Sequence, residues 1–251
     1  MGRIEFENIH KSFGDNVVLR GVDLTVEPGS VFYVIGQSGA GKSVLVKHLV
    51  GLLEPDEGRI YLDEEDITDL TESEFYRVRK RCAMVFQNST LFDSMTLLEN
   101  VALPIRKHRD VTVSEAREEA REHLDVVEMA EYADRNPADF GDGMRKKVAI
   151  ARALTLDPEY VIFDEPTTGL DPLSASIVDD LIRDLADDVG VTSIVISHDL
   201  RSIFGVADRI AMLYKGRLRL VGTPQDFRQA DDPVVRQFIE GRPEGPMEEP
   251  Q

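Results

Sequence analysis

A short glycine-rich segment near residue 40 limits what this chain can fold into more than any other feature does. It lies between the apolar run Val31–Ile35, which is long enough for a buried strand, and a helical pattern that ends at Gly51. The segment fits the pattern G-x-x-x-x-G-K-[ST] at every fixed position, and it consists of Gly36, Gln37, Ser38, Gly39, Ala40, Gly41, Lys42 and Ser43. A strand, a glycine loop and a helix in this order predict a phosphate-binding loop.

The residue types in this loop suit a nucleotide with its magnesium ion. The glycines let the backbone curl so that its N–H groups face phosphate oxygens, and the following helix adds the positive end of its dipole. We expect Lys42 to reach the β- and γ-phosphates and the Ser43 hydroxyl to ligate Mg²⁺. A plain glycine-rich turn is the alternative, but it does not account for the match at every fixed position.

The composition of the chain argues against several classes of protein. Its net charge of −18 over 251 residues argues against nucleic acid as a partner and against direct binding to anionic lipid. No apolar run approaches the roughly 20 residues that cross a bilayer, and the N-terminus has no apolar signal region. We therefore expect a cytosolic protein that needs a separate partner for any membrane role. The one cysteine, Cys82, sits in an apolar run, which favours core packing over reactivity.

Strands alternate with helices along most of the chain. Apolar patterns predict strands over residues 3–10, 17–26 (interrupted at Gly21), 31–35, 59–62, 82–86, 160–164, 192–196, 209–214 and 217–221. Capping residues and helical spacing predict helices over residues 71–81, 96–104 (ended by Pro104), 114–129 (capped by Ser114), 144–155, 172–189, 224–229 and 233–240. Residues 88–157 carry few strand signals, so we expect a helical block inserted into an α/β domain of residues 1–240. The Pro- and Glu-rich tail, 241–251, is predicted to be disordered.

Polar residues follow the apolar strands at the points where those strands end. Asp164 and Glu165 close one strand, and His198 comes directly after another. Alternating strands and helices imply a largely parallel sheet, which binds ligands at the carboxyl ends of its strands. We therefore expect the phosphate-binding loop, the two carboxylates and His198 to converge on one site.

Each of these side chains has a role in phosphate chemistry and a structural alternative. Asp164 is placed to orient Mg²⁺, and Glu165 to polarise an attacking water as general base. His198 would contact the γ-phosphate, and Gln87, after the strand at 82–86, would ligate Mg²⁺ and hold the water. The alternative for the carboxylates is a turn before Pro166, and the alternative for His198 is a cap on the helix after it.

The ordered series of motifs resembles the ATPase subunit of ABC transporters over nearly the whole chain. The matching segments are residues 36–43 as the Walker A motif, Gln87 as the Q-loop glutamine, residues 160–165 as Walker B with its catalytic glutamate, residues 169–172 with Asp171 as the D-loop, and His198 as the switch histidine. This resemblance implies the α/β fold of phosphate-loop ABC ATPases. That fold has a mostly parallel core sheet, an antiparallel β part and an inserted helical subdomain.

The resemblance also implies ATP and Mg²⁺ as cofactors and extends the site to Phe13. By itself an aromatic residue beside Gly14 favours core or turn packing, but in the family an aromatic at this place stacks on adenine. The residues then expected to bind ATP are Phe13, Gly36, Gln37, Ser38, Gly39, Ala40, Gly41, Lys42, Ser43, Val44 and Gln87. Those expected to hold Mg²⁺ are Ser43, Gln87 and Asp164, and those expected to act in catalysis are Lys42, Glu165 and His198.

Within the family, the chain is most similar to the ATPases of MCE-linked lipid transport systems, the Mla or Mkl type. The segments that carry this similarity are residues 41–48, 91–101 and 143–147. It implies a pair of ATPase subunits under a paired integral membrane permease, peripheral to the inner face of the cell membrane. An MCE-type protein would handle phospholipid or other hydrophobic cargo. The groove near Gln87 and residues 91–95 would receive a cytoplasmic helix of the permease.

One motif departs from the family pattern. The signature LSGGQ, or LSGGM in this subgroup, aligns with residues 140–144, where Gly141 replaces the serine and Asp142 the first glycine; Gly143 and Met144 follow. In the family this segment closes over the γ-phosphate held by the other subunit. Gly141 removes a hydroxyl donor, and Asp142 brings a carboxylate towards a polyanion. A second interpretation, compatible with the first, makes Asp142 the cap of the helix that follows.

Two functions of different classes follow from these motifs. The first is an energy-coupling ATPase, in which ATP closes a dimer, hydrolysis opens it, and a permease moves with it. The second is an ATP-dependent dimerising switch or scaffold that turns over poorly because its signature is altered. An ordinary phosphate-loop kinase would leave Gln87, Asp171 and His198 unexplained. The chain also lacks the long coiled-coil insertion of ABC proteins that act on chromosomes.

Overall fold

A six-stranded sheet forms the centre of the molecule. The computed structural model describes residues 2–247. The strand order is β10-β9-β3-β8-β7-β6, in which β9, β3, β8, β7 and β6 run parallel and β10 runs antiparallel to β9. The strands are β3 (Val31–Ile35), β6 (Cys82–Val85), β7 (Tyr160–Asp164), β8 (Thr192–Ile196), β9 (Arg209–Tyr214) and β10 (Arg217–Gly222). Every residue of β3 and β8 is buried, because both faces of the sheet are covered.

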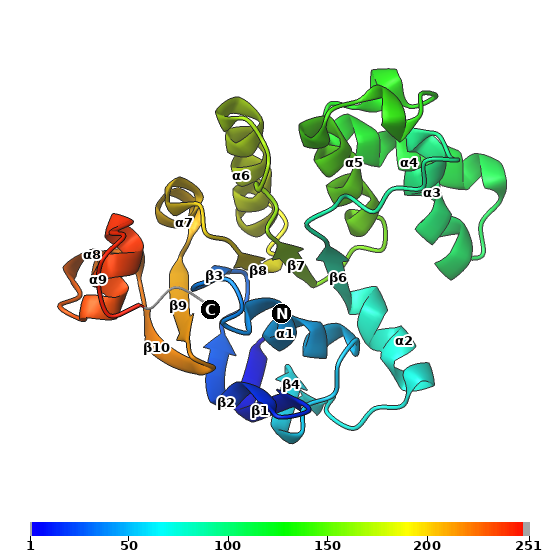
Figure 1. The fold of residues 1–251 in the computed structure, drawn as a ribbon. Coiled ribbons are helices and arrows are strands. Elements are labelled where there is room, and N and C mark those ends of the chain that lie inside the picture. Colours follow the sequence, from blue (N-terminus) through cyan, green and yellow to red (C-terminus); the bar gives the residue numbers. More distant parts are fainter. Residues whose placement is uncertain (1, 248–251) are drawn as a thin grey trace.

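A second sheet of four antiparallel strands covers one side of the first. Its order is β2-β1-β4-β5, with β1 (Ile4–Phe13), β2 (Asn16–Val26), β4 (Glu57–Leu62) and β5 (Glu65–Asp66). Helix α1 (Lys42–Lys47), continued by a 3₁₀ turn at His48–Val50, packs in one apolar core with residues of both sheets (Figure 1). The phosphate-binding loop is therefore held between the two sheets.

Helices between β6 and β7 form a separate block, drawn in green at the upper right of Figure 1. It contains α3 (Leu97–His108), α4 (Val113–Val126) and α5 (Asp142–Leu154), with 3₁₀ turns at Ala130–Tyr132 and Pro137–Asp139. These helices share an apolar core of their own, which includes Leu98, Val101, Ala120, Leu124 and Val148. Residues 86–159, all of which the structure describes, form no strand.

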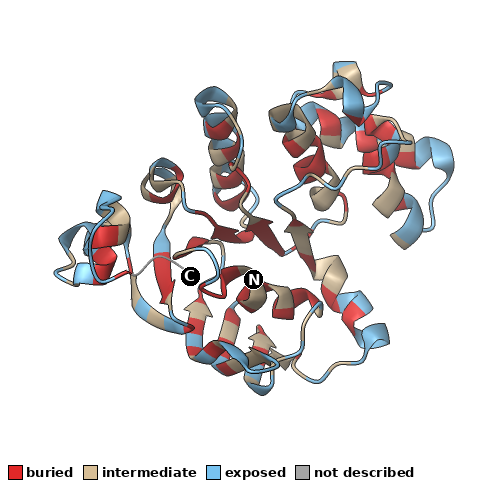
Figure 2. Cartoon of the chain, viewed as in Figure 1, coloured by how far each residue is buried: buried red, intermediate tan, exposed pale blue. Residues whose placement is uncertain are grey.

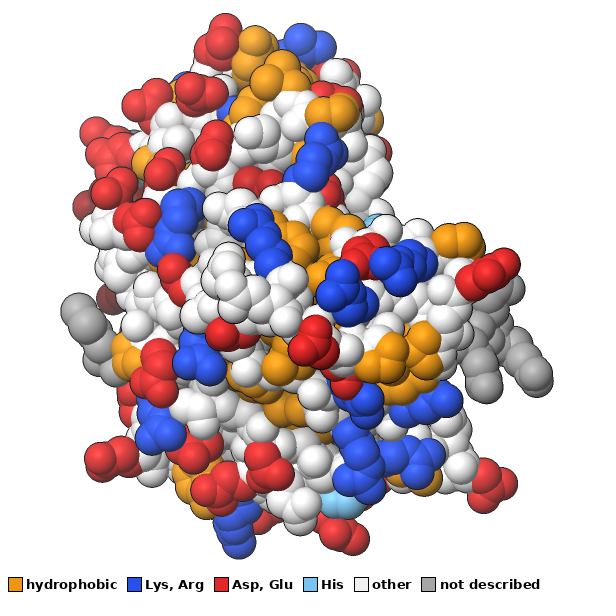
Figure 3. All heavy atoms as spheres, turned by 90° about the vertical axis from the view of Figure 1, so that its left-hand side faces the viewer, with side chains coloured by type: hydrophobic (Ala, Val, Ile, Leu, Met, Phe, Trp, Pro, Cys, Tyr) orange, Lys and Arg blue, Asp and Glu red, His pale blue; other side chains and the backbone are white. Residues whose placement is uncertain are grey.

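The remaining helices flank the sheets. They are α2 (Glu72–Arg81), α6 (Pro172–Asp187), α7 (Leu200–Val206), α8 (Pro224–Gln229) and α9 (Pro233–Glu240). Figure 2 shows buried residues along the central strands and on the inner sides of the helices. Figure 3 shows acidic side chains gathered over the upper left of one face and Lys and Arg side chains at its lower right, so charge is unevenly distributed there. None of the helices in residues 2–247 is long and apolar enough to cross a bilayer.

Three predictions about individual helices and strands are wrong. Pro104 lies inside α3 and does not end it, because Val101, Ala102 and Ile105 are buried on either side and hold the helix together. Helix α4 is capped by Thr112 and not by Ser114, since Thr112 and Glu115 have the spacing of a capping box.

The third concerns β2, which runs through Gly21 without a break. Gly21 has a φ of +78° and lies where the pairing of β1 with β2 shifts register, so the glycine accommodates a β-bulge. At the other end of the chain, the residues after α9 form no helix or strand up to Met247. Disorder of the tail stays a prediction, and residues 248–251 of it lie outside the described residues.

Candidate nucleotide-binding site

The loop between β3 and α1 has the geometry of a phosphate cradle. Gly36, Gly39 and Gly41 have φ values of +144°, +77° and +102°, in the region that favours glycine. A Cβ at Gly36 would lie 2.2 Å from the carbonyl oxygen of Leu213 in β9, so no larger residue fits there. The loop is therefore curled tightly against the carboxyl end of the sheet.

Lys42 is held inside this loop. Its Nζ donates to the carbonyl oxygens of Gly36 and Gln37, both at 2.8 Å, and the residue is only 7% exposed. Burial lowers the pKa of the ammonium below its ordinary value, while the charges of Glu165 and Asp164 act in the opposite sense. Two of the N–H donors of Lys42 are thus used by the loop itself, which leaves a third for an anion.

The two strongest candidates for magnesium ligands lie together. Ser43 Oγ, in the first turn of α1, donates to Asp164 Oδ1 at the end of β7 over 3.0 Å. A hydroxyl and a carboxylate are hard oxygen ligands, which suits Mg²⁺ shared with substrate phosphates. Among residues 2–247, no three His, Cys, Asp or Glu side chains are grouped to hold a metal by themselves. The donor set therefore fits an ion that arrives with a nucleotide.

Glu165 and His198 form a pair at the ends of β7 and β8. His198 Nδ1 lies 2.9 Å from Glu165 Oε2, and the same oxygen accepts a hydrogen bond from Thr168 Oγ1 at 2.6 Å. Glu165 has a φ of +54°, which is uncommon for a residue other than glycine, and its N–H donates to the carbonyl of Ile196. Such backbone strain persists where surrounding contacts fix it, as these do.

The structural alternative for His198 is wrong. Helix α7 is capped by Asp199, whose carboxylate accepts from the N–H of Arg201 at 2.9 Å. The His198 side chain is instead 59% exposed and turned to Glu165. Both residues are therefore available to a ligand in the loop.

Phe13 ends β1 with a half-exposed ring, and Lys11 Nζ lies 5.6 Å from the ring centroid. The ring is accessible for stacking, which is what the prediction of an adenine contact requires. Val44 lies in the first turn of α1, and its side chain packs on the core between the sheets. Only its backbone is therefore placed to meet a ligand in the loop.

The altered signature lies at the start of α5. The cap of this helix is Gly141, whose residue type makes no side-chain cap bond, and Asp142 is the first helical residue. The proposed capping role of Asp142 is therefore wrong: it sits one residue too late and forms an ion pair with Arg145, one turn along the same face. A Cβ at Gly143 would lie 2.8 Å from Ser174 Oγ, so α5 approaches the start of α6 here. Met144 packs on the core of the helical block.

Asp171 is the cap of α6. Its Oδ1 accepts from the N–H groups of Leu173 and Ser174 at 3.0 and 3.1 Å, and its Oδ2 accepts from Ser174 Oγ at 2.6 Å. The hydrogen bonds from Ser174 lower the pKa of the carboxyl below its ordinary value. This residue is thus held as a carboxylate beside the start of α5.

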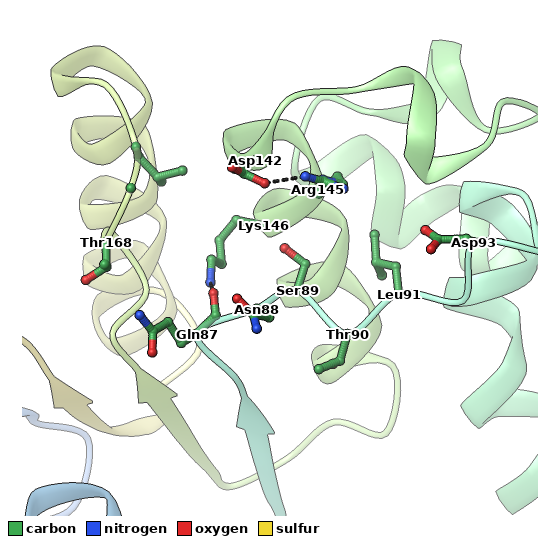
Figure 4. Close-up of a pocket in the computed structure, with 12 residues that line it drawn as sticks. Gln87, Asn88, Ser89, Thr90, Leu91, Asp93, Asp142, Arg145, Lys146 and Thr168 are labelled. Atoms are coloured by element: carbon green, nitrogen blue, oxygen red, sulfur yellow. Dashed lines mark hydrogen bonds and ion pairs between the residues drawn. The ribbon is translucent and has the colours of Figure 1, made fainter.

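Gln87 lines a pocket of about 470 Å³ between the end of β6, the start of α5 and the segment after β7 (Figure 4). Asp142, Arg145, Lys146 and Thr168 line the same pocket. Within residues 2–247, no hydrogen bond joins the Gln87 side chain to Ser43 or Asp164. The structure therefore brings together the loop, Asp164, Glu165 and His198. Gln87 lies instead beside α5 of the helical block.

Two buried polar residues beside this pocket were missed by sequence reasoning. Lys146 is 2% exposed, and its Nζ donates to the carbonyl oxygens of Phe86 at 3.0 Å and Gln87 at 2.5 Å. Burial lowers its pKa to about 8, while Asp142 and Asp164 act in the opposite sense. Its position four residues before the apolar Ile150 was the signal that it faces inward.

The other missed residue is Asn100, which is fully buried in α3. It accepts from the N–H of Phe92 at 2.7 Å and donates to the carbonyls of Phe92, Met95 and Thr96. This one side chain fixes the turn over residues 92–96 next to the pocket. An asparagine beside the buried Val101 on the apolar side of a predicted helix was the available signal.

Comparison of the sequence with known proteins identifies a family. The family model described as "ABC transporter" matches residues 19–168. The chain is 37% identical to the "Probable ribonucleotide transport ATP-binding protein mkl" of Mycobacterium tuberculosis, over 97% of this chain and 68% of that protein. It is 36% identical to the "Intermembrane phospholipid transport system ATP-binding protein MlaF" of Haemophilus influenzae, over 97% of this chain and 92% of that protein.

A solved structure is similar over most of the chain. It is the dimeric structure of an ATP-binding cassette in a post-hydrolysis state, bound to ADP and Pi, with a TM-score of 0.81 and 29% identity. The match covers 88% of this chain and 98% of that chain. The fold is therefore that of the ATP-binding cassettes.

Proposed function

The chain belongs to the ABC transporter family, and we propose that it is the ATP-hydrolysing subunit that couples ATP to transport. The observation that carries this proposal is the hydrogen bond of Ser43 with Asp164, which joins the phosphate-binding loop to the end of β7 across 121 residues. Beside it stands the carboxylate of Glu165, which pairs with His198 at the end of β8. The test is Mg²⁺-dependent ATPase activity of the full chain, compared with that of Glu165→Gln.

In this proposal each side chain has one task. The curled loop binds the phosphates through its N–H groups, Lys42 neutralises their charge, and Phe13 stacks on the adenine. Ser43 and Asp164 hold Mg²⁺, with Gln87 as a third ligand; the ion supplies charge neutralisation when it is bound. Glu165 takes the proton of the attacking water. His198, oriented by Glu165, contacts the γ-phosphate.

A second copy of the chain completes each site. We propose that Gly141, Gly143 and Met144 of one subunit meet the nucleotide held by the other, and that Asp171 lies at the same interface. The dimeric ADP-bound cassette supports this arrangement, since it has the same fold. The helical block of α3, α4 and α5 has its own apolar core, which supports its movement as a unit.

The cargo is argued from the relatives. The Mkl protein is named for ribonucleotides and MlaF for phospholipids. We favour phospholipid or another hydrophobic cargo, because the match to MlaF covers 92% of that protein and the match to Mkl 68%. The chain would then act at the inner face of the membrane under a permease, with an MCE-type protein as a further partner. Stimulation of the ATPase–permease complex by ribonucleotides and not by phospholipids would contradict this.

A first prediction concerns the permease contact. We propose that the turn over residues 92–96 receives a cytoplasmic helix of the permease, because it is rigid, half exposed and apolar at Phe92. Ser94→Cys should therefore crosslink to the permease through a short thiol reagent. Ser94 is exposed, whereas Thr96 caps α3 and should be left intact.

Reaction of the thiol reagent with the native Cys82 should be slow, because this residue is buried. Burial raises the pKa of the Cys82 thiol, the chain's only native cysteine, to about 12. Ser114→Cys is the matched control, since Ser114 is exposed on α4. Equal crosslinking from both positions, or crosslinking from Ser114 alone, would contradict the placement.

A second prediction separates an efficient ATPase from a weakly active switch. An unpaired carboxylate at 142 would repel a γ-phosphate about 4–5 Å away by about 3–4 kcal/mol. Asp142 is instead paired with Arg145 and well exposed, which reduces the repulsion between its carboxylate and the γ-phosphate to about 1 kcal/mol or less. A hydroxyl bonded to a phosphate contributes about 1.5–3 kcal/mol. We therefore expect Gly141→Ser to raise ATPase activity about tenfold and Asp142→Gly less than about fivefold.

Gly141 can accept this change. Its φ is −71°, and a Cβ there would meet no atom within 4 Å, so a serine fits and also improves the helix cap. The measurements are ATPase rate and ATP-dependent dimer mass for both single variants and the double variant. A larger gain from Asp142→Gly would show that Arg145 does not neutralise the carboxylate. No gain from either would leave the signature as a tolerated variation.

A further inference from the structure

Lys146 of α5 forms hydrogen bonds with the segment that follows β6 of the central sheet. It projects from α5, which packs on two cores: Val148 and Ala151 belong to that of the helical block, and Ala149 and Ile150 to that of the central sheet. Its Nζ donates to the carbonyls of Phe86 and Gln87, the first two residues after β6. Figure 4 shows the Lys146 side chain pointing towards Gln87. One ammonium thus adds a polar link between α5 and the segment after β6, beside the apolar contacts that Ala149 and Ile150 make with the core of the central sheet.

A second cation on α5 holds the same segment further along. Arg152 donates from Nη1 to the carbonyl of Thr90 at 2.9 Å, and from Nη2 to Thr90 Oγ1 at 3.0 Å and to the carbonyl of Ser89 at 3.3 Å. Residues 86–90 are therefore held by hydrogen bonds to α5 as well as by their covalent connection to β6. Of the two cations, Lys146 is the one that contacts Gln87 itself.

Packing alone does not explain this lysine. A buried charge is costly unless it is compensated, and an apolar side chain of similar length often stabilises a fold at least as well. Lysine offers three rotatable donors on a flexible stem, which suits two carbonyls at once. It also lies one turn after Asp142, between the signature end of α5 and Gln87.

We propose that Lys146 is a positioning residue for ATP hydrolysis: it ties the backbone of Phe86 and Gln87 to α5, so that the Gln87 side chain moves with the signature helix. This inference rests on the proposed ATPase function. When α5 shifts toward the partner's nucleotide, Gln87 shifts with it at the subunit's own site. The altered signature and the Q-loop glutamine are then linked by one side chain.

Four full-length proteins test this: the parent, Lys146→Met, Lys146→Arg and Lys147→Met. Lys147 is the matched control, because it is the next residue on α5 and pairs with the surface residue Glu128 at 3.1 Å. We expect Lys146→Met to lower kcat about 10- to 100-fold, the scale for a displaced reacting geometry. Its ATP dissociation constant should stay within about twofold, since Lys42 and the loop are untouched. Lys146→Arg keeps the charge and should retain at least about a third of kcat.

Hydrogen exchange supplies a second readout. Amides of residues 87–90 should exchange faster in Lys146→Met and not in Lys147→Met, with the melting temperature of both close to that of the parent. Parental kcat in Lys146→Met would overturn the proposal. A second result would also overturn it: Lys146→Met and a further variant, Lys146→Gln, both lose kcat and both melt at a clearly lower temperature than the parent. That result would mark a purely structural role. A parent without ATPase activity, or one equalled by Glu165→Gln, would instead overturn the proposed function.

Discussion

Glu165→Gln is expected to lower kcat for ATP hydrolysis about 10²- to 10⁴-fold, the usual contribution of a general base. Glutamine keeps the size and shape of the side chain but cannot take a proton from water. Its amide oxygen can still accept the hydrogen bond from Thr168 Oγ1, so the local structure should persist. ATP should bind with unchanged affinity, and the closed dimer should accumulate. The measurements are ATPase rate, ATP affinity and dimer mass in the presence of ATP and Mg²⁺.

Glu159→Gln is the matched control for this experiment. Glu159 precedes β7 at the opposite end of the strand and pairs with Arg81 Nε at 2.6 Å. Its substitution can change stability slightly but should leave hydrolysis at the parental rate. If Glu165→Gln hydrolyses ATP as fast as Glu159→Gln, Glu165 is not the base.

The parts of the fold that sequence alone predicted are those whose signal is local. The bounds of β3 and β8 are confirmed: β3 is an unbroken apolar run, as expected of a strand buried on both faces, and β8 ends in the β-branched run Ile194–Ile196. The bounds of α8 and α9 are also confirmed, since each begins with a proline after a capping residue. Convergence at the carboxyl ends of β3, β7 and β8 followed from the parallel topology.

The parts that were not predicted depend on partners elsewhere in the chain or on a one-residue shift. The capping role expected for Asp142 failed because α5 begins at Asp142 itself, two residues before the predicted range 144–155, and the carboxylate pairs with Arg145. Pro104 read as a stop because its tertiary support is not visible locally. The function of Lys146 is set by carbonyls about 60 residues away. No local pattern carries that information, although the helical spacing of α5 could have shown that Lys146 is buried.

Lys42→Ala is expected to weaken ATP binding by about 2–3 kcal/mol, roughly 30- to 150-fold, because it removes a charge-assisted hydrogen bond to the phosphates. The backbone cradle should remain, because Gly36 and Gly41 keep their positive φ values and their close packing on β9 and β2, although the two hydrogen bonds of Lys42 to the loop are lost. Lys47→Ala is the control: Lys47 lies at the end of the same helix, where its charge faces the negative pole of the dipole and not the loop. ATP affinity measured by calorimetry should therefore fall in the first variant and stay near the parental value in the second. Equal affinities in both would mean that the Lys42 ammonium remains with the carbonyls of Gly36 and Gln37 and does not bind the nucleotide.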